Sequence, residues 1–399
     1  MVTPDTRHTF LSHATHRWGL SARKRNDRPA TCLPSSLAVT NLVTAVTTLV
    51  MQPVDVTQKI VGNSKWCGDG PSLASGLPLQ SYPVTTLGGM NVMGIKKSML
   101  HRKVLAALCL SVISGAAMAA LPGPMVSAHW LKTHSQDKRL VILDLRSPKA
   151  YAAGHIPGAI SAPYFHWRMM IRGVNRMLPP IPVIQAYLRS VGVNNNSEVV
   201  VYNDIATPMG LGLGGETRAF WTLKVLGHNS EAILKGGFEG WQKSHGALTR
   251  TVRRAHGDFT AHYQPQIYAT LQQVRADLHT HVVLVDNRPM HQIVGLTKAP
   301  FVARYGHIPG AVPYPVTWMV GRNGNLLPKA KLEALARVAG FPENHNAPMV
   351  TYCNTGHWAS IGWFVVTQEL GYKNVRLYDG SMTQWAYHHG DPVAVGFVN

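Results

Sequence analysis

The sequence predicts an α/β protein with two tandem domains, each built around a mostly parallel sheet. Three observations support this prediction: one order of motifs occurs twice, the hydrophobic runs are short and β-branched, and stretches with helical spacing separate them. Such runs are typical of strands that are buried on both faces of a parallel sheet. Alternation of strands and helices implies a layered α/β structure. A chain of 399 residues can give both domains a sizeable core.

Both copies of the repeat run in the order strand, Asp-x-Arg, Gly-His-Ile-Pro-Gly-Ala, strand, loop, helix, strand, glycine turn and Trp. In the first copy, over 125–245, these parts lie at residues 140–146, 154–159, 198–202, 215–226 and 234–241. In the second copy, over 269–396, they lie at residues 282–288, 306–311, 348–352, 359–370 and 378–385. Gly227 and Gly371 follow the two predicted helices and favour their ends there. The segment 246–268 has few aliphatic residues and is predicted to be the linker.

The first 119 residues are predicted to lie outside the two domains. Residues 1–92 show little periodicity, and we expect a disordered or non-native leader. Residues 93–119 have the order of a secretory signal peptide: basic residues, an apolar run, and Ala117-Met118-Ala119 as the cleavage site. A buried helix of the mature fold is the alternative. Because export signals begin chains, our hypothesis is that translation starts at Met90, Met93 or Met99. The protein would then be periplasmic or secreted, and otherwise cytoplasmic.

Processing of this segment can be tested directly. If the chain is expressed with its signal in a bacterium, we expect the exported protein to begin near Ala120, because signal peptidase reads small residues such as Ala117 and Ala119. N-terminal sequencing or intact mass measures the start. An exported protein that retains residues 1–119 would contradict the signal hypothesis.

The charge of the chain is strongly positive but dispersed. Lys and Arg number 38 against 19 Asp and Glu, which gives a formal net charge of +19. Beyond Met118, no run of basic residues is longer than Arg253-Arg254, which argues against a nucleic-acid-binding stripe. Dispersed positive charge instead favours solubility and the steering of small anions. No membrane span is expected to remain after processing, since the apolar run of the signal is removed.

Cys353 is the only cysteine beyond the predicted signal, because the others are Cys32, Cys67 and Cys109. A lone thiol in an exported domain cannot form an internal disulfide, so it is either a buried structural residue or a reactive group. The 20 His residues are scattered and no cysteine pair has the spacing of zinc ligands. We therefore expect no metal and no cofactor.

The paired Asp-x-Arg and Gly-His-Ile-Pro-Gly-Ala segments resemble those of the rhodanese superfamily. Two copies with a cysteine only in the second resemble tandem thiosulfate or mercaptopyruvate sulfurtransferases, and the likeness covers residues 125–396. It implies that each rhodanese-like domain is a small open sheet flanked by helices. It also implies an inactive first domain, with Asn203 and Asp204 where the second domain has Cys353.

The resemblance further implies a two-step sulfur exchange. Cys353 would take the outer sulfur of a small anionic donor, such as thiosulfate or mercaptopyruvate, and become a persulfide. Cyanide or a thiol would then accept this sulfur.

The residues around Cys353 suit a nucleophile. Cys353 directly follows the predicted strand 349–352 and precedes a helix that we expect to start near Ala359. Backbone N–H groups and the positive end of a helix favour an anionic sulfur at such a place. Gly356 lets the backbone curl, and Ser360 is expected to cap the helix or to donate a hydrogen bond at its start. We predict Cys353 as the catalytic residue and the following loop as the substrate-binding part, namely Asn354, Thr355, Gly356, His357 and Trp358.

The loop departs from the pattern of the resembling family, so the donor stays open. Thiosulfate-preferring members usually carry basic residues straight after the cysteine, whereas Thr355-Gly356 partly matches mercaptopyruvate-type members. His357 is interpreted either as a pH-sensitive donor to a substrate anion or as a solvent-facing residue. Arg288 is a candidate for binding the donor, although a structural pair with Asp286 is the favoured interpretation. Gln292 replaces a second basic residue of the family, for which Lys298 and Arg304 are substitutes.

Two other functions compete with sulfur transfer. A cysteine-dependent phosphatase needs an Arg six positions after its cysteine to clamp phosphate, and this chain has Ala359 there. The stronger alternative is a non-enzymatic rhodanese-like module that binds a partner or senses oxidants through Cys353.

Overall fold

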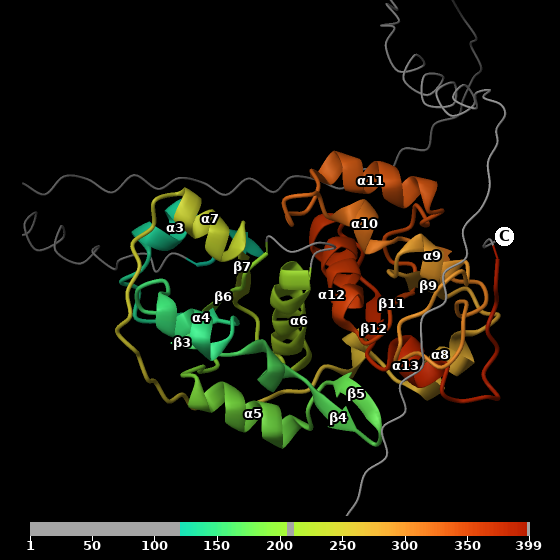
Figure 1. Ribbon diagram of the computed structural model, residues 1–399, viewed down its shortest axis with the longest axis horizontal. Coiled ribbons are helices and arrows are strands. Elements are labelled where there is room, and N and C mark those ends of the chain that lie inside the picture. The colour runs from blue at the N-terminus through green and yellow to red at the C-terminus, as the bar shows by residue number, and fades with distance from the viewer. Residues whose placement is uncertain (1–119, 206–210, 397–399) are drawn as a thin grey trace, which may run out of the picture. The chain divides into compact units, whose positions relative to one another are not determined.

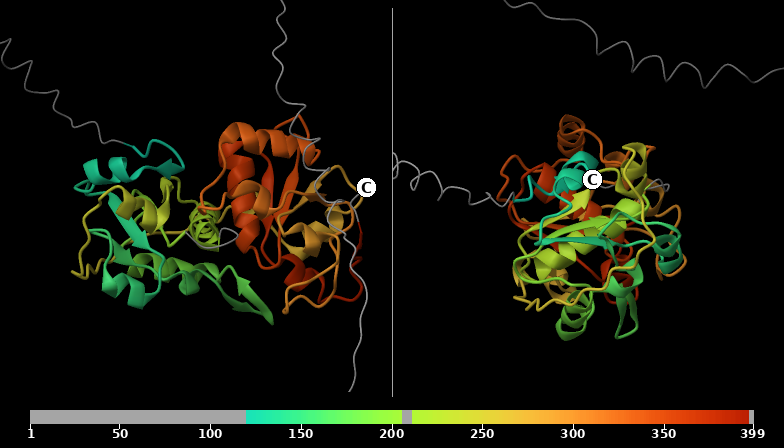
Figure 2. Two further views of the ribbon diagram at one scale, coloured as in Figure 1. Left: turned by 45° about the horizontal axis from the view of Figure 1, so that its top comes forward. Right: turned by 90° about the vertical axis from the view of Figure 1, so that its left-hand side faces the viewer.

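The computed structural model describes residues 120–205 and 211–396, all of which belong to one compact unit (Figure 1). These residues form two five-stranded parallel sheets in tandem, with helices on both faces of each, and a separate two-stranded hairpin (Figure 2). The predicted α/β class with two tandem domains is confirmed. The predicted leader over 1–92 and signal over 93–119 lie outside the described residues.

The first domain has the strand order β1-β7-β6-β2-β3. Its strands are β1 (Met125–Val126), β2 (Leu140–Asp144), β3 (Ile160–Ser161), β6 (Glu198–Tyr202) and β7 (Glu231–Leu234). Its helices are α3 (Ala128–Thr133), α4 (Pro148–Ala153), the short 3-10 helix η1 (Tyr164–Trp167), α5 (Ile181–Ser190), α6 (Leu211–Val225) and α7 (Gly237–Lys243). An antiparallel hairpin of β4 (Met169–Ile171) and β5 (Val174–Met177) lies between η1 and α5 in the chain.

The second domain has the strand order β10-β9-β11-β12-β8. Its strands are β8 (Tyr268–Ala269), β9 (Val283–Asp286), β10 (Val312–Pro313), β11 (Met349–Tyr352) and β12 (Val375–Tyr378). Its α-helices are α8 (Leu271–Asp277), α9 (Met290–Ile293), α10 (Val316–Met319), α11 (Lys329–Val338), α12 (His357–Phe364) and α13 (Ser381–Trp385). The 3-10 helix η3 (Pro265–Ile267) precedes β8, and the π-helical turn η4 (Val365–Glu369) continues α12.

The two sheets have the same strand order and the same register at their centres. Asp144 pairs with Tyr202 at the end of β2 and β6, and Asp286 pairs with Tyr352 at the end of β9 and β11. The residues after these strands, Asn203 and Cys353, are therefore equivalent positions. This confirms the predicted duplication.

The repeated Asp-x-Arg segment is structural in both domains. Arg288 Nη2 donates to Asp286 Oδ2 at 2.6 Å and to the Gly306 carbonyl at 2.9 Å. Arg146 makes the same contacts with Asp144 and Gly154, at 2.6 and 2.8 Å. Each pair thus fastens the strand end to the Gly-His-Ile-Pro-Gly-Ala segment. Recurrence of the motif in both copies, with and without the cysteine, fits this structural role.

A continuous apolar core joins the two domains. Because successive strand residues point to opposite faces, Val141 and Leu143 of β2 face this core whereas Leu140 and Ile142 face the outer helices α3 and α7. Helices α6 and α12 lie side by side in the core, where the rings of Phe220 and Phe364 are 5.0 Å apart and edge to face. Extensive apolar contact of this kind favours a fixed arrangement of the domains.

Two predicted elements differ from the structure. Helix α12 begins at His357 rather than near Ala359, because Gly356 caps it in the left-handed conformation (φ 71°). The predicted linker over 246–268 packs on the first domain: Phe259 is fully buried, and its N–H donates to the Val193 carbonyl at 3.1 Å. A low aliphatic content gave no sign of this single buried aromatic residue.

Candidate active site

Cys353 lines a cavity of about 570 Å³ at the end of β11. Its side chain is buried, with the residue only 1% exposed. Most of the predicted loop residues line this cavity with it, namely Asn354, Thr355, His357 and Trp358. Gly356 and Arg288 do not line it. The cavity therefore brings together five of the seven residues that the sequence singled out.

The loop curls around the hydroxyl group of Ser381. Cys353 N and Gly356 N both donate to Ser381 Oγ at 3.1 Å, and this hydroxyl donates to the Tyr378 carbonyl at 2.8 Å. Thr355 N lies 3.4 Å from Cys353 Sγ and donates to the sulfur. The N–H groups of Cys353 and Gly356 are thus bound by Ser381, whereas the N–H group of Thr355 reaches the sulfur. No sequence motif pointed to Ser381, although it follows the repeated glycine turn.

Gly356 holds a conformation that other residues adopt at a cost. Its φ of 71° is in the left-handed region, and an added Cβ would come within 2.3 Å of Arg218 Nη1. Gly356 is therefore a structural residue of the loop, and its predicted place among the substrate-binding residues does not fit this geometry.

Arg288 was a candidate for binding the donor, with a structural pair as the favoured interpretation, and its position fits the structural pair. The side chain is fully buried and bound to Asp286 and to the Gly306 carbonyl. Arg304 is likewise engaged, because it donates to the carbonyls of Ala386 and His388 and does not line the cavity. Lys298 lines the cavity as expected. Gln292 also lines it and accepts a hydrogen bond from Asn354 Nδ2 at 2.8 Å.

The first domain contributes a buried cation behind the loop. Arg218 of α6 is fully buried, and its Nη2 forms an ion pair with Asp379 Oδ1 at 2.5 Å. Its Nη1 donates to the Gly356 carbonyl at 3.3 Å, and Asp379 Oδ2 accepts from Leu178 N at 2.6 Å. The first domain thus holds the loop that follows Cys353 in the second domain.

Ser360 forms a second link between the domains. Its hydroxyl lies 2.9 Å from that of Thr217 on α6 and donates to the His357 carbonyl at 2.7 Å. Of the two predicted roles of Ser360, that of a cap of α12 is wrong, since Gly356 holds that position. The predicted hydrogen bond at the start of the helix is made, to the carbonyl of its first residue, His357.

His357 is a neutral residue in this site. Burial, together with the nearby charges of Arg168 and Arg218, lowers its pKa to about 3. Its Nδ1 lies 2.7 Å from the hydroxyl of Tyr164, whose pKa is raised by burial, so the hydroxyl keeps its proton and donates. Gly214 of α6 leaves room for the ring, because a Cβ there would lie 2.5 Å from Nε2. Neither earlier interpretation of His357 fits this environment.

We expect His357 to make the protein less stable in acid. Unfolded His357 takes up a proton below its ordinary pKa of 6.5, whereas the folded residue does so only near 3. Between these values protonation favours the unfolded chain, so stability falls as pH falls. In His357→Gln this contribution is absent. Urea unfolding at pH 7 and pH 5 should therefore show a larger loss for the wild type, and equal losses would show that the ring titrates normally.

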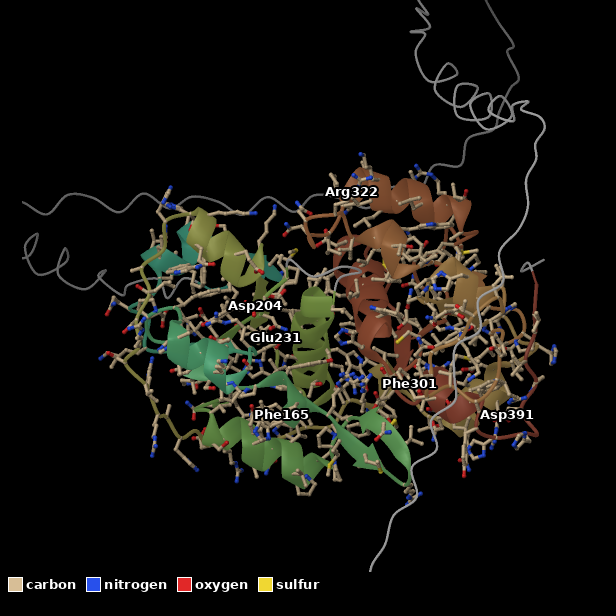
Figure 3. The ribbon with its side chains drawn as sticks, viewed as in Figure 1. Phe165, Asp204, Glu231, Phe301, Arg322 and Asp391 are labelled. Atoms are coloured by element: carbon tan, nitrogen blue, oxygen red, sulfur yellow. The ribbon has the colours of Figure 1, made fainter. Side chains whose placement is uncertain are left out.

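Two arginines of the hairpin were not predicted. Arg168 and Arg176 line the same cavity as Cys353, and the guanidinium of Arg176 lies against the ring of Phe301. Figure 3 shows Phe301 near the boundary of the two domains. Between α10 and α11, the second copy has a single antiparallel bridge of Val320 with Leu326 where the first copy has this hairpin, and the repeated motifs did not include either segment. The positive charge absent from the loop is thus supplied by the first domain.

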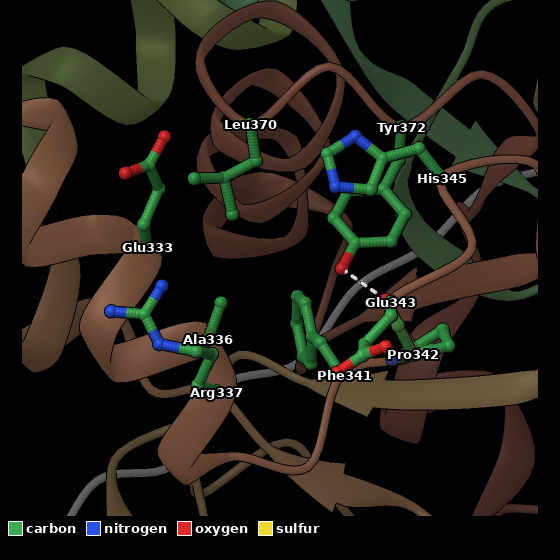
Figure 4. A pocket seen from close by; sticks show the side chains of 9 residues that line it. All are labelled: Glu333, Ala336, Arg337, Phe341, Pro342, Glu343, His345, Leu370 and Tyr372. Atoms are coloured by element: carbon green, nitrogen blue, oxygen red, sulfur yellow. Dashed lines mark hydrogen bonds between the residues drawn. The ribbon is translucent and has the colours of Figure 1, made fainter. Parts of the chain in front are cut away.

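A second cavity, of about 400 Å³, lies away from Cys353 between α11 and the end of η4 (Figure 4). Its floor includes Tyr372, which stacks on His345 and donates to the Pro342 carbonyl at 2.6 Å. It contains no residue of the Cys353 cavity. Within 120–205 and 211–396, no cluster of His, Cys, Asp and Glu is arranged to hold a metal. In the same ranges, no helix combines the length and hydrophobicity needed to cross a membrane.

Comparison with known proteins gives the family. The model of the rhodanese-like domain matches residues 127–244 and 270–388. The 3-mercaptopyruvate sulfurtransferase of Escherichia coli K12 is 29% identical over 67% of this chain and 96% of its own length. The sulfur carrier protein TtuD of Thermus thermophilus is 28% identical over 69% of this chain and 98% of its own length.

A solved structure agrees with these relatives. The crystal structure of SseA from Escherichia coli, described as a 3-mercaptopyruvate sulfotransferase with the rhodanese fold, has a TM-score of 0.57. It is 28% identical and covers 65% of this chain and 98% of that one. The relatives' names support sulfurtransferase activity in general. The chain belongs to the rhodanese family, as a tandem of two rhodanese-like domains of which the second carries the cysteine.

Proposed function

We propose that this protein transfers sulfane sulfur through a persulfide on Cys353. The observation that carries the proposal is that Cys353 lines a cavity, with the Thr355 N–H on its sulfur and cationic side chains among the other lining residues. Donors at a sulfur atom suit an anion, and both the thiolate and the persulfide are anions. The positive charges of these side chains then attract an anionic donor to the nucleophile.

The first step would load the cysteine. With thiosulfate, the thiolate of Cys353 attacks the outer sulfur, the S–S bond breaks and sulfite leaves with its electron pair. With mercaptopyruvate, the C–S bond breaks, and the enolate of pyruvate leaves and takes up the proton of the new persulfide. Both reactions conserve charge and need no oxidant. Neither requires an acid–base residue next to the cysteine, because the attacking group is already an anion.

The second step would unload it. Cyanide or a thiolate attacks the outer sulfur of the persulfide, which leaves thiocyanate or a new persulfide and returns the thiolate of Cys353. We propose both donor types, since the loop lacks flanking cations whereas Arg168, Arg176 and Lys298 supply positive charge elsewhere in the cavity. The loop alone favoured an organic donor, and the hairpin removes part of that argument.

Turnover with both donors tests the proposal. Purified protein is given thiosulfate or mercaptopyruvate with cyanide, and thiocyanate is measured against sulfite or pyruvate. We expect one thiocyanate for each sulfite or pyruvate. Absence of turnover with both donors, together with reversible oxidation of Cys353 by peroxide, would favour the redox-sensing module instead.

A further inference from the structure

The hairpin that carries the two cavity arginines is anchored to the second domain. Leu178, directly after β5, donates its N–H to Asp379 Oδ2 at 2.6 Å. The turn residues Arg172 and Gly173 both have positive φ, as in a tight two-residue hairpin turn. The hairpin therefore has a defined position over the cavity rather than that of a loose loop.

The guanidinium groups of the hairpin lie against aromatic rings. That of Arg168 is 4.5 Å from the ring centre of Tyr164, and that of Arg176 is 5.1 Å from the ring centre of Phe301. Stacking occupies the planar face of a guanidinium and leaves its N–H edge available to a ligand. Both rings thus help to orient the two cations.

The charge of these two arginines is not balanced within the cavity. No Asp or Glu is among the residues that line it. Arg168 Nη1 is buried and has no hydrogen-bond partner among the described residues. Burial lowers the pKa of Arg168, and the nearby charges of Arg218 and Arg176 lower it further, which is the effect of crowded cations. A buried guanidinium N–H without a partner is costly unless an acceptor binds it.

Lys298 is a weaker candidate for the same role. Its Nζ already donates to the Val302 carbonyl at 2.8 Å. An ammonium group is also a point charge, whereas a guanidinium edge matches two oxygens of one oxyanion.

We propose that Arg168 and Arg176 form the oxyanion subsite of the donor, so that the domain without a nucleophile determines which donors reach Cys353. The ligand class is a small sulfur donor with a carboxylate or sulfonate-like end. Mercaptopyruvate and thiosulfate share this chemistry. Describing the ligand as a sulfur donor rests on the proposed function. The anion-binding site itself does not depend on that function.

Alkylation of Cys353 by iodoacetate and by iodoacetamide tests the anion subsite separately from the proposed sulfur transfer. In each reaction the sulfur attacks carbon and iodide leaves, and the reagents differ in one negative charge. Rates at Cys353 are measured in the full chain by peptide mass spectrometry, for wild type, Arg168→Gln, Arg176→Gln and Arg172→Gln. Arg172 is the matched control, because it is an exposed arginine of the same hairpin that does not line the cavity.

We expect the ratio of the iodoacetate rate to the iodoacetamide rate to fall about tenfold in Arg168→Gln and in Arg176→Gln, the loss of a hydrogen bond to a charged group. The ratio should stay near the wild-type value in Arg172→Gln. In the two variants whose ratio falls, the KM of the anionic donor should rise. Unchanged ratios in the first two variants would overturn the subsite. Arg176 is exposed, so its variant tests the inference even if Arg168→Gln fails to fold. A changed ratio without persulfide formation would leave the subsite standing and refute the proposed function.

Discussion

Cys353→Ser should abolish sulfur transfer with every donor while the protein keeps its fold. A hydroxyl has nearly the size of a thiol but does not form the nucleophilic anion at neutral pH. The new hydroxyl would still have the N–H of Thr355 as a partner, so little stability should be lost. Thiocyanate formation measures the activity, and urea unfolding measures the stability.

Asn203→Ser is the matched control for this variant. Asn203 holds the equivalent position after β6, and it does not line the cavity of Cys353. We expect this variant to keep its activity. Normal transfer by Cys353→Ser, or an equal loss in both variants, would contradict the assignment of Cys353 as the sulfur carrier.

Arg218→Met should destabilise the protein by about 3–5 kcal/mol, as expected when one partner of a buried ion pair is removed. Asp379 is fully buried, and without Arg218 its Oδ1 would lose its counter-charge. The Gly356 carbonyl would lose a donor at the same time, so we also expect slower sulfur transfer. The free energy of unfolding in urea and the rate of thiocyanate formation are the measurements.

Two further variants give this prediction a control. Lys329→Met removes a partner from the exposed pair of Lys329 and Glu333, which are 4.0 Å apart, and should cost less than about 1 kcal/mol. Arg218→Met with Asp379→Asn should recover part of the loss, because no buried charge remains unpaired. If Arg218→Met were as mild as Lys329→Met, the buried pair would not hold the domains together.

The repeat made much of the fold predictable. The likeness of the two sheets and the equivalence of Asn203 and Cys353 follow from motifs that recur in one order, because duplicated sequences fold alike. The recurrence of Asp-x-Arg in both halves also favoured a structural role for Arg288, which its buried contacts with Asp286 support. Its alternative role in binding the donor had only the family likeness behind it.

The parts of the site that the sequence did not reveal depend on contacts between distant segments. Arg218 reaches the Gly356 carbonyl across 138 positions, and no local pattern around either residue signals this. Ser381 accepts a hydrogen bond from the Cys353 N–H because β12 lies beside β11. Its role could therefore be inferred only once the strand order of the sheet was known. Arg168 stands directly before the hairpin of β4 and β5, and its place in the same cavity as Cys353 depends on how the domains pack.

The central claim is that sulfur travels on Cys353. Mass spectrometry of the purified protein, after incubation with thiosulfate or mercaptopyruvate and removal of the donor, tests it most directly. We predict a gain of one sulfur atom on the peptide that contains Cys353, and its loss after cyanide is added. No gain with either donor, or a gain on any other peptide that cyanide discharges, would contradict the account.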